Sequence, residues 1–206
     1  MEQERMGACT NCGKEFSKRA MRSHVATCFA PAKDGIKETI IQLLVAPPRG
    51  SDYWLYLDVK ATVALTRIDE FLRNIWLECC GHLSCFLDNK KEVPKRRLVG
   101  DCFYENNVKL DYEYDFGSTT ELTIKAVRRR QGVIGKRLVE LLARNNPPVF
   151  KCYKCGKPAE VLCQYCMDDD FFFCIEHAEE HGCANPDEYL PVVNSPRMGV
   201  CGYTGD

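Results

Sequence analysis

The stretch KLDYEYDFGSTTELTIKAV, residues 109–127, decides the fold of this chain. Polar and apolar side chains alternate along both of its halves, and a period of two is the pattern of a strand with one buried face. A Gly-Ser pair separates the halves, and these residue types favour turns. The stretch therefore predicts a β-hairpin whose turn lies near residues 116–118.

Two strands and one helix are predicted before the hairpin. Residues 36–46 and 52–61 are rich in β-branched and aromatic side chains, and the Pro-Pro-Arg-Gly between them predicts a loop. From residue 67 to about residue 78 apolar side chains recur at helical spacing, and Thr66 is a suitable N-cap for this helix. A glycine ends the helix, and HLSCFLD predicts another strand.

The phrases GHLSCF and YEYDFGSTTEL, with the strand and helix before them, resemble the Ri-plasmid Orf-three-like family, whose relatives include passenger proteins of some insertion elements. The later phrases LLARNNPPVFKC and NSPRMGVCGY resemble a zinc-bearing subgroup of that family. The resemblance implies an α+β domain over residues 36–145, with a curved, largely antiparallel sheet and a packed helix. It also implies a prokaryotic source, but it implies no particular reaction.

Fourteen cysteines in a chain of 206 residues are far above ordinary usage and indicate either disulfides or metal sites. The first residues contain no apolar core of a signal peptide, and no apolar stretch approaches the length that spans a bilayer. We therefore expect a cytoplasmic, reduced protein without a membrane partner. In that setting C-x2-C pairs are metal ligands rather than disulfides.

Residues 1–30 have the spacing of a single small zinc finger. Its four ligands follow in the order Cys, Cys, His, Cys: Cys9, Cys12, His24 and Cys28. Phe16 and Met21 would form its miniature core, and bound zinc would supply much of its folding free energy. Its predicted helix carries three cations that could contact phosphates or base edges: Lys18, Arg19 and Arg22. A structural or protein-docking role is an equal alternative.

Residues 150–206 contain eight regularly spaced ligands, the number that two closed tetrahedral zinc sites need. They are Cys152, Cys155, Cys163, Cys166, Cys174, His177, His181 and Cys183. The spacing resembles the B-box class of zinc modules, in which ligand pairs interleave. That resemblance implies one ion on the first and third pairs and another on the second and fourth. A sequential arrangement, with the four leading cysteines on one ion, stays open.

The segment HAEEH, residues 177–181, spells the inverted zinc-peptidase motif H-x-x-E-H. A catalytic zinc needs an open position for water, whereas His177 and His181 have enough neighbouring thiolates to complete four-coordinate sites. We therefore expect structural ligands here, with Glu180 as a surface carboxylate.

The hairpin offers a second candidate site. Asp111, Glu113 and Asp115 alternate along its first strand, so the pattern predicts that the three carboxylates share one face. Such a face could hold a divalent metal for phosphoryl chemistry. The commoner alternative is a solvated face that pairs with Lys125 across the hairpin.

Cys79, Cys80, His82 and Cys85 form a further cluster that could bind a metal or supply a nucleophile. Alternate residues of a strand point to opposite sides, and small cysteines are common in cores. Core packing is therefore the prediction for this cluster, and Cys201 has no assigned role.

The charge is uneven along the chain. Residues 151–206 carry 4 basic and 10 acidic side chains, which makes this third a poor nucleic-acid surface. Basic runs lie in the central segment, where they could form a phosphate-binding patch or simply be solvated loops. The candidate DNA or RNA contacts are Lys90, Lys91, Lys95, Arg96, Arg97, Arg128, Arg129 and Arg130.

These features predict a non-enzymatic zinc-binding interaction or regulatory protein that holds three zinc ions. Its basic central region would contact nucleic acid, and its acidic C-terminal module would bind a protein. Two alternatives stay open. One is a metal-dependent, nuclease-like enzyme of a mobile element that uses the carboxylate face, and the other is a factor that docks proteins only.

Overall fold

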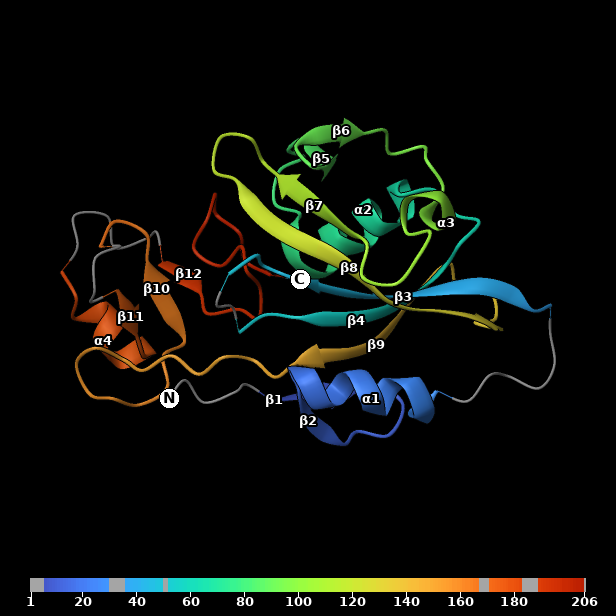
Figure 1. Cartoon of the computed structure of the whole chain (residues 1–206). Helices are drawn as coiled ribbons and strands as arrows, with labels where there is room; N and C mark the ends of the chain where they lie inside the picture. The colour runs from blue at the N-terminus through green and yellow to red at the C-terminus, as the bar shows by residue number, and fades with distance from the viewer. Residues whose placement is uncertain (1–5, 30–35, 50–51, 167–170, 183–188, 206) are drawn as a thin grey trace. The chain divides into compact units, whose positions relative to one another are not determined.

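The chain forms two compact units. The larger unit comprises Met1–Leu72 and Leu83–Asn146, and the smaller unit comprises Arg73–His82 and Pro147–Asp206. The computed structural model describes residues 6–29, 36–49, 52–166, 171–182 and 189–205 (Figure 1). In this part of the chain no helix is long and apolar enough to span a bilayer.

A nine-stranded sheet forms the larger unit, and each of its strand pairings is antiparallel. In chain order the strands are β1 (Met6–Cys9), β2 (Glu15–Ser17), β3 (Glu38–Ala46), β4 (Leu55–Lys60), β5 (Ser84–Asp88), β6 (Lys91–Val93), β7 (Lys109–Tyr114), β8 (Thr120–Gly132) and β9 (Val139–Asn145). Their spatial order is β2-β1-β9-β4-β3-β8-β7-β5-β6. The helices are α1 (Lys18–Cys28), α2 (Thr66–Leu72) and α3 (Val99–Cys102). The α+β class with an antiparallel sheet is thereby confirmed.

The predicted hairpin is β7–β8. Leu110, Tyr112 and Tyr114 are buried and alternate with more exposed residues, as the sequence pattern requires. The strand ends at Tyr114, which pairs with Thr120. Asp115 begins the turn with a φ of 65°, in the left-handed region. The turn therefore spans residues 115–119 and includes the predicted position.

The predicted helix from residue 67 to about residue 78 is not continuous. The α-helix ends at Leu72, and a π-helix, η1 (Arg73–Leu77), follows it. The N–H of Glu78 donates to the carbonyl of Arg73 over 2.9 Å, which is the i to i−5 bond of a π turn. Apolar spacing alone cannot distinguish these two helix types, so the sequence did not reveal the change.

Helices cover both faces of the sheet in the larger unit. The Arg128 guanidinium donates to the carbonyl of Ala26 in α1, whereas that of Arg129 donates to the carbonyls of Gly100 and Phe103 at α3. Consecutive residues of a strand point to opposite faces, so α1 and α3 lie on opposite sides of β8. This arrangement explains why β3 and β4 are apolar on both faces.

The N-terminal segment belongs to this sheet, because β1 pairs with β9, and β9 pairs with β4. In α1, Met21 and Val25 are almost completely buried and pack in one cluster with Trp54 and Tyr56. Burial of these large side chains stabilises the segment together with the sheet. The predicted finger therefore shares its apolar core with the central domain.

The smaller unit contains η1 and a three-stranded antiparallel sheet in the order β11-β10-β12. These strands are short: β10 (Val161–Cys163), β11 (Phe172–Phe173) and β12 (Tyr189–Pro191), with one helix, α4 (Ile175–Glu179). The cluster of buried residues around Cys163 and Phe173 is small. Short strands with a small apolar cluster are marginal for independent stability, which makes cross-links by metal ions important in this part of the unit.

Candidate metal centres

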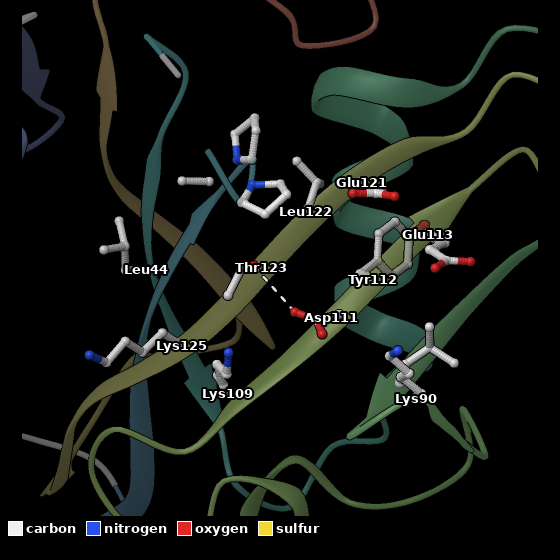
Figure 2. A pocket seen from close by; sticks show the side chains of 14 residues that line it. Leu44, Lys90, Lys109, Asp111, Tyr112, Glu113, Glu121, Leu122, Thr123 and Lys125 are labelled. Carbon is white, nitrogen blue, oxygen red and sulfur yellow. Dashed lines mark hydrogen bonds between the residues drawn. The ribbon is translucent and has the colours of Figure 1, made fainter. Parts of the chain in front are cut away.

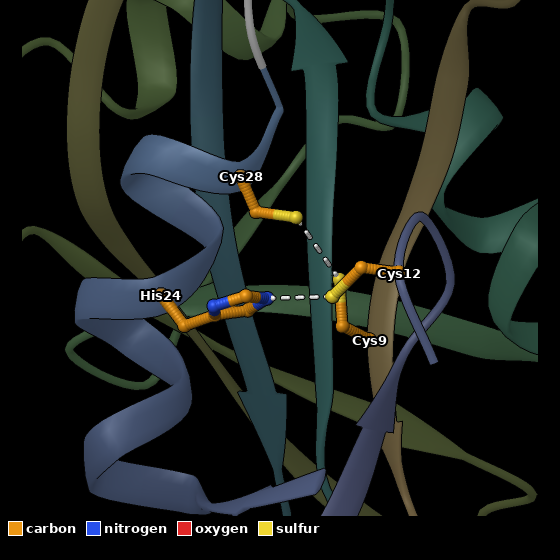
Figure 3. A group of neighbouring side chains, drawn as sticks. All are labelled: Cys9, Cys12, His24 and Cys28. Atoms are coloured by element: carbon orange, nitrogen blue, oxygen red, sulfur yellow. Dashed lines mark hydrogen bonds between the residues drawn. The ribbon is translucent and has the colours of Figure 1, made fainter. Parts of the chain in front are cut away.

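The four predicted ligands of the N-terminal segment lie together between β1 and α1 (Figure 3). The Sγ atoms of Cys9 and Cys28 are 3.8 Å apart, and Cys12 Sγ lies 3.3 Å from His24 Nε2. All four ligand atoms lie within 4.8 Å of one another. Zinc–sulfur bonds of about 2.3 Å place two sulfurs of a tetrahedral site about 3.8 Å apart, so the cluster fits a zinc-type ion.

Local structure positions these ligands. Cys9 ends β1, and Gly13, with a φ of 70°, turns the chain so that its N–H donates to the Cys9 carbonyl over 2.9 Å. The hydroxyl of Ser17 caps α1 by accepting from the N–H of Ala20. The ring of His24 stacks on that of Phe16 at 4.3 Å, which orients the imidazole.

The thiols of this cluster differ in acidity. Burial raises the pKa of the Cys9 thiol. The backbone N–H of Lys14 lowers the pKa of the Cys12 thiol, which is exposed. A backbone N–H that stabilises a thiolate in this way favours metal binding, because the thiolate is the ligand.

In the smaller unit, one cluster joins the first and third predicted pairs: Cys152, Cys155, Cys174 and His177. Cys155 Sγ and Cys174 Sγ are 3.8 Å apart, and His177 Nδ1 lies 3.2 Å from Cys174 Sγ. Gly156 has a φ of 73°, and its N–H donates to the Cys152 carbonyl over 2.9 Å, which repeats the turn at Gly13.

The Cys152 thiol of this cluster is more acidic than an ordinary cysteine. Burial opposes ionisation, but N–H groups of Cys174, Cys155 and Lys154 lower the pKa of the Cys152 thiol to about 6. A thiol with that pKa is largely thiolate at neutral pH and is therefore prepared to bind a metal.

The second and fourth predicted pairs contribute another cluster, which contains Cys163, Cys166 and His181. Cys166 Sγ lies 3.2 Å from His181 Nε2. The predicted fourth ligand, Cys183, lies outside the described residues. The grouping in the structure follows the interleaved arrangement, because Cys152 and Cys155 lie with Cys174 rather than with Cys163.

The two histidines of HAEEH lie in different clusters. His177 presents Nδ1 to Cys174, whereas His181 presents Nε2 to Cys166. Glu180 follows the end of α4 and is exposed. The arrangement therefore differs from a zinc-peptidase motif, in which both histidines bind one ion.

The prediction of core packing for Cys79, Cys80 and His82 was wrong. Cys80 is exposed, the other two are half-buried, and all three cluster with Cys201. Cys85 is buried in β5, so the prediction was right for that residue alone. The strand begins only at Ser84, which leaves the Cys-Cys-Gly-His segment in an irregular turn. No spacing signal in the sequence joins this segment to Cys201.

The three hairpin carboxylates do not share one face. Asp111 and Glu113 lie on the more exposed face of β7, but Asp115 is past the end of the strand and buried. The Asp115 carboxylate accepts from the N–H of Gly117 at 3.0 Å within the turn. Among the described residues, no cluster of side chains that could hold a metal ion includes these carboxylates. The single-face prediction was wrong because the strand ends one residue too early.

A pocket of about 560 Å³ lies beside this hairpin (Figure 2). Three cations and three carboxylates are among the side chains that line it: Lys90, Lys109, Lys125, Asp111, Glu113 and Glu121. Asp111 lies opposite Thr123 and accepts its hydroxyl at 3.3 Å, whereas Lys125 lies opposite Lys109 rather than a carboxylate. The balanced charges give this pocket no preference for a polyanion.

The eight predicted nucleic-acid contacts differ in their surroundings. Lys95 pairs with Asp69, and Arg130 pairs with the buried Asp58. Arg128 and Arg129 donate to backbone carbonyls as described above. The remaining four are exposed: Lys90, Lys91, Arg96 and Arg97.

No protein-family model matches the sequence, and no curated protein matches it. One solved structure whose backbone aligns with part of this chain is the crystal structure of a protein of unknown function from Methanosarcina mazei Go1. It has 13% sequence identity, and the alignment covers 52% of this chain and 67% of that chain with a TM-score of 0.42. At that TM-score the similarity supports no functional argument. The chain is thus characterised by its Cys/His clusters, which could hold metal ions and are compatible with zinc.

Proposed function

We propose that this protein is a non-enzymatic, zinc-binding interaction protein whose ions hold small modules in a fixed shape. One zinc ion would bind Cys9, Cys12, His24 and Cys28. A second would bind Cys152, Cys155, Cys174 and His177, and a third Cys163, Cys166, His181 and Cys183. The observation that carries the proposal is the convergence of predicted ligands at sulfur–sulfur distances of 3.8 Å in two separate modules.

The ligand chemistry supports structural rather than catalytic ions. Each proposed site has three thiolates and one histidine, and four such ligands leave no open position for water. Thiolates also transfer negative charge to the ion and make it a weak Lewis acid. The protein would therefore use zinc for folding free energy and for presenting a surface.

The zinc proposal is tested by native mass spectrometry of the full chain, with elemental analysis for the metal identity. At least three zinc ions per chain are expected. Cys12→Ser and Cys155→Ser should each remove one ion, whereas Cys102→Ser, a buried cysteine outside every cluster, should remove none. Fewer than two ions in the wild-type chain would refute the ligand assignment.

We also propose that the larger unit contacts DNA or RNA through four exposed cations. Lys90 and Lys91 lie at the turn between β5 and β6, and Arg96 and Arg97 follow β6. All four are exposed, whereas Lys95 and Arg130 already pair with carboxylates. Exposed cations bind phosphates by releasing counterions, so the affinity should fall steeply with salt.

A matched pair of double variants tests this surface. Lys90→Glu with Lys91→Glu should reduce DNA binding about tenfold or more at roughly 0.1 M salt, and should lower the salt slope by about two. Lys37→Glu with Arg49→Glu changes the net charge equally at exposed positions elsewhere in the larger unit and should have little effect. Equal losses in both variants would indicate a nonspecific charge effect and contradict the proposed surface.

If neither DNA nor RNA binds with salt dependence, the protein would be a docking factor for proteins only. Membership in the Ri-plasmid Orf-three-like family, a mobile-element context, a prokaryotic source and a cytoplasmic location remain proposals that rest on the sequence. The carboxylate face gives no support to a nuclease, because Asp115 lies apart from Asp111 and Glu113.

A further inference from the structure

A fourth Cys/His cluster lies in the smaller unit, outside the three sites proposed above. Three of its members are in the turn after η1, and the fourth lies in the C-terminal segment: Cys79, Cys80, His82 and Cys201. Their ligand atoms all lie within 4.8 Å of one another. None of the four residues is buried, whereas each of the other clusters contains at least one buried cysteine.

The distances match a metal site rather than a disulfide. Cys80 Sγ lies 3.7 Å from the Sγ atoms of both Cys79 and Cys201. His82 Nε2 points between two thiols, 2.9 Å from Cys80 Sγ and 3.2 Å from Cys201 Sγ. The sulfurs of a disulfide are about 2.05 Å apart, and an imidazole takes no part in that bond. Tetrahedral zinc places two sulfur ligands about 3.8 Å apart and also binds imidazole nitrogen.

The backbone around the cluster has the conformations that turn ligands toward one point. Gly81 has a φ of 80°, and it follows a cysteine as Gly13 and Gly156 do in two of the other clusters. Cys201 itself has a φ of 53°. The left-handed region is unfavourable for a non-glycine residue, and such a conformation is maintained where the surroundings require it.

Hydrogen bonds hold the turn after η1 in this shape. Arg73 donates to the Glu78 carboxylate and to the His82 carbonyl, both at 2.6 Å. The other oxygen of Glu78 accepts from the N–H of Gly81 at 2.5 Å. Arg73, which donates two of these three bonds, is the first residue of η1.

The segment before Cys201 is anchored independently. The Ser195 hydroxyl donates to the Trp76 carbonyl at 2.6 Å and accepts from the N–H of Arg197 at 2.9 Å. Trp76 and Arg197 are both fully buried. The C-terminal segment is therefore packed on η1 within the smaller unit, which brings Cys201 to the turn of residues 79–82.

We propose that Cys79, Cys80, His82 and Cys201 bind a fourth zinc ion, which cross-links the segment of residues 73–82 to the C-terminal segment. The site is a closed set of three thiolates and one imidazole. Because none of its ligands is buried, it exchanges its ion with added chelators faster than the other three sites. The proposal is independent of nucleic-acid binding and adds one ion to the three already assigned.

Native mass spectrometry of the full chain gives the first test. The wild-type chain is expected to carry four zinc ions and the Cys201→Ser variant three. Cys85→Ser, at a buried cysteine outside every cluster, should keep four. A wild-type chain with three ions would overturn the fourth site and leave the proposed function intact. Four ions retained in Cys201→Ser would overturn it equally, whereas fewer than two in the wild type would refute the proposed function itself.

Thiol alkylation of the wild-type chain provides a test that needs no variant to fold. Iodoacetamide should modify Cys80 and Cys201 slowly while four ions are bound. A chelator that removes one ion per chain should accelerate alkylation of these two cysteines at least tenfold, ahead of Cys12 and Cys155, which are also exposed ligands. Rapid alkylation of Cys201 in the fully metal-loaded chain would contradict the proposal.

Discussion

The Sγ atoms of Cys80 and Cys201 lie 3.7 Å apart, although 121 positions separate the two residues in the chain. The other two clusters of the smaller unit use ligands from residues 152–181, within one continuous segment. The contact between Cys80 and Cys201 thus joins the two chain segments of which the smaller unit is made. A metal ion at this contact would restrain a very long loop, and the entropic benefit of such closure grows with loop length.

Metal removal should affect the two units unequally. Strong chelation should lower amide-exchange protection in β10 and β12 at least a hundredfold, because the smaller unit has short strands and a small apolar cluster. Strands β3, β4 and β8 should keep most of their protection, since they lie inside a nine-stranded sheet. Hydrogen exchange with mass spectrometry resolves these segments, and equal losses in both units would contradict the expectation.

The sequence predicted the clusters whose ligands are close in the chain. Pairs such as Cys9 and Cys12 carry their own signal, because a C-x2-C turn places two thiols on one ion whatever the rest of the fold does. The pairing of distant segments carries no such signal. Cys201 is a single cysteine, and the packing of the C-terminal segment on η1, where Ser195 bonds to Trp76, brings it near Cys80. The fourth cluster could therefore not be predicted from spacing.

The fold shows the same division between local and non-local features. The β7–β8 hairpin was predictable because alternation and turn residues occur within one stretch. The strand β9 was not predicted, since it lies between β1 and β4 and its burial does not alternate regularly. The π turn of η1 and the early end of β7 at Tyr114 were also missed. Both depend on hydrogen bonds that a hydrophobic pattern does not record.

The shared core predicts that α1 contributes to the stability of the larger unit. Met21→Ala should reduce the free energy of unfolding of this unit by about 2–5 kcal/mol, because it truncates a fully buried side chain of α1 that packs in one cluster with Trp54. Met6→Ala removes the same side chain from an exposed position and should cost less than about 0.5 kcal/mol. Urea unfolding followed by Trp54 fluorescence, with Trp76→Phe as the background, measures both.

The close packing of Gly7 in β1 against Arg144 and Trp54 predicts that a larger residue at position 7 destabilises the larger unit. A Cβ atom at Gly7 would lie 2.4 Å from the Arg144 carbonyl oxygen and from the Trp54 ring, so β1 would have to move. Gly7→Ala should destabilise the larger unit by about 1–3 kcal/mol. Gly117→Ala is the control, because the nearest atom to its Cβ would be Asp115 Oδ1 at 3.4 Å, which is an ordinary van der Waals distance. Comparable stability of the two variants would show that β1 adjusts freely.

A buried polar network predicts how stability depends on pH. Asp69 Oδ1 accepts from Ser84 Oγ at 2.6 Å, from Lys95 Nζ at 3.0 Å and from Tyr112 OH at 2.8 Å. Burial opposes its charge, but these donors hold the pKa of the Asp69 carboxyl below its ordinary value. A depressed pKa means that the ionised group stabilises the fold above the unfolded-state pKa of about 3.9, and that this stabilisation is lost as the pH falls through the folded-state pKa.

Asp69→Asn should therefore lower the free energy of unfolding by about 1–3 kcal/mol at neutral pH, because Lys95 and Tyr112 lose a charged acceptor. The difference from wild type should shrink as the pH falls below about 4, where the wild-type carboxylate becomes protonated. Asp101→Asn removes an exposed carboxylate and should follow the wild-type curve at every pH. Unfolding curves in urea between about pH 3 and pH 7 provide the measurement. If the free energies of unfolding of wild type and Asp69→Asn differed by the same amount at every pH, the charge of the Asp69 carboxylate would not be the source of its stabilising effect.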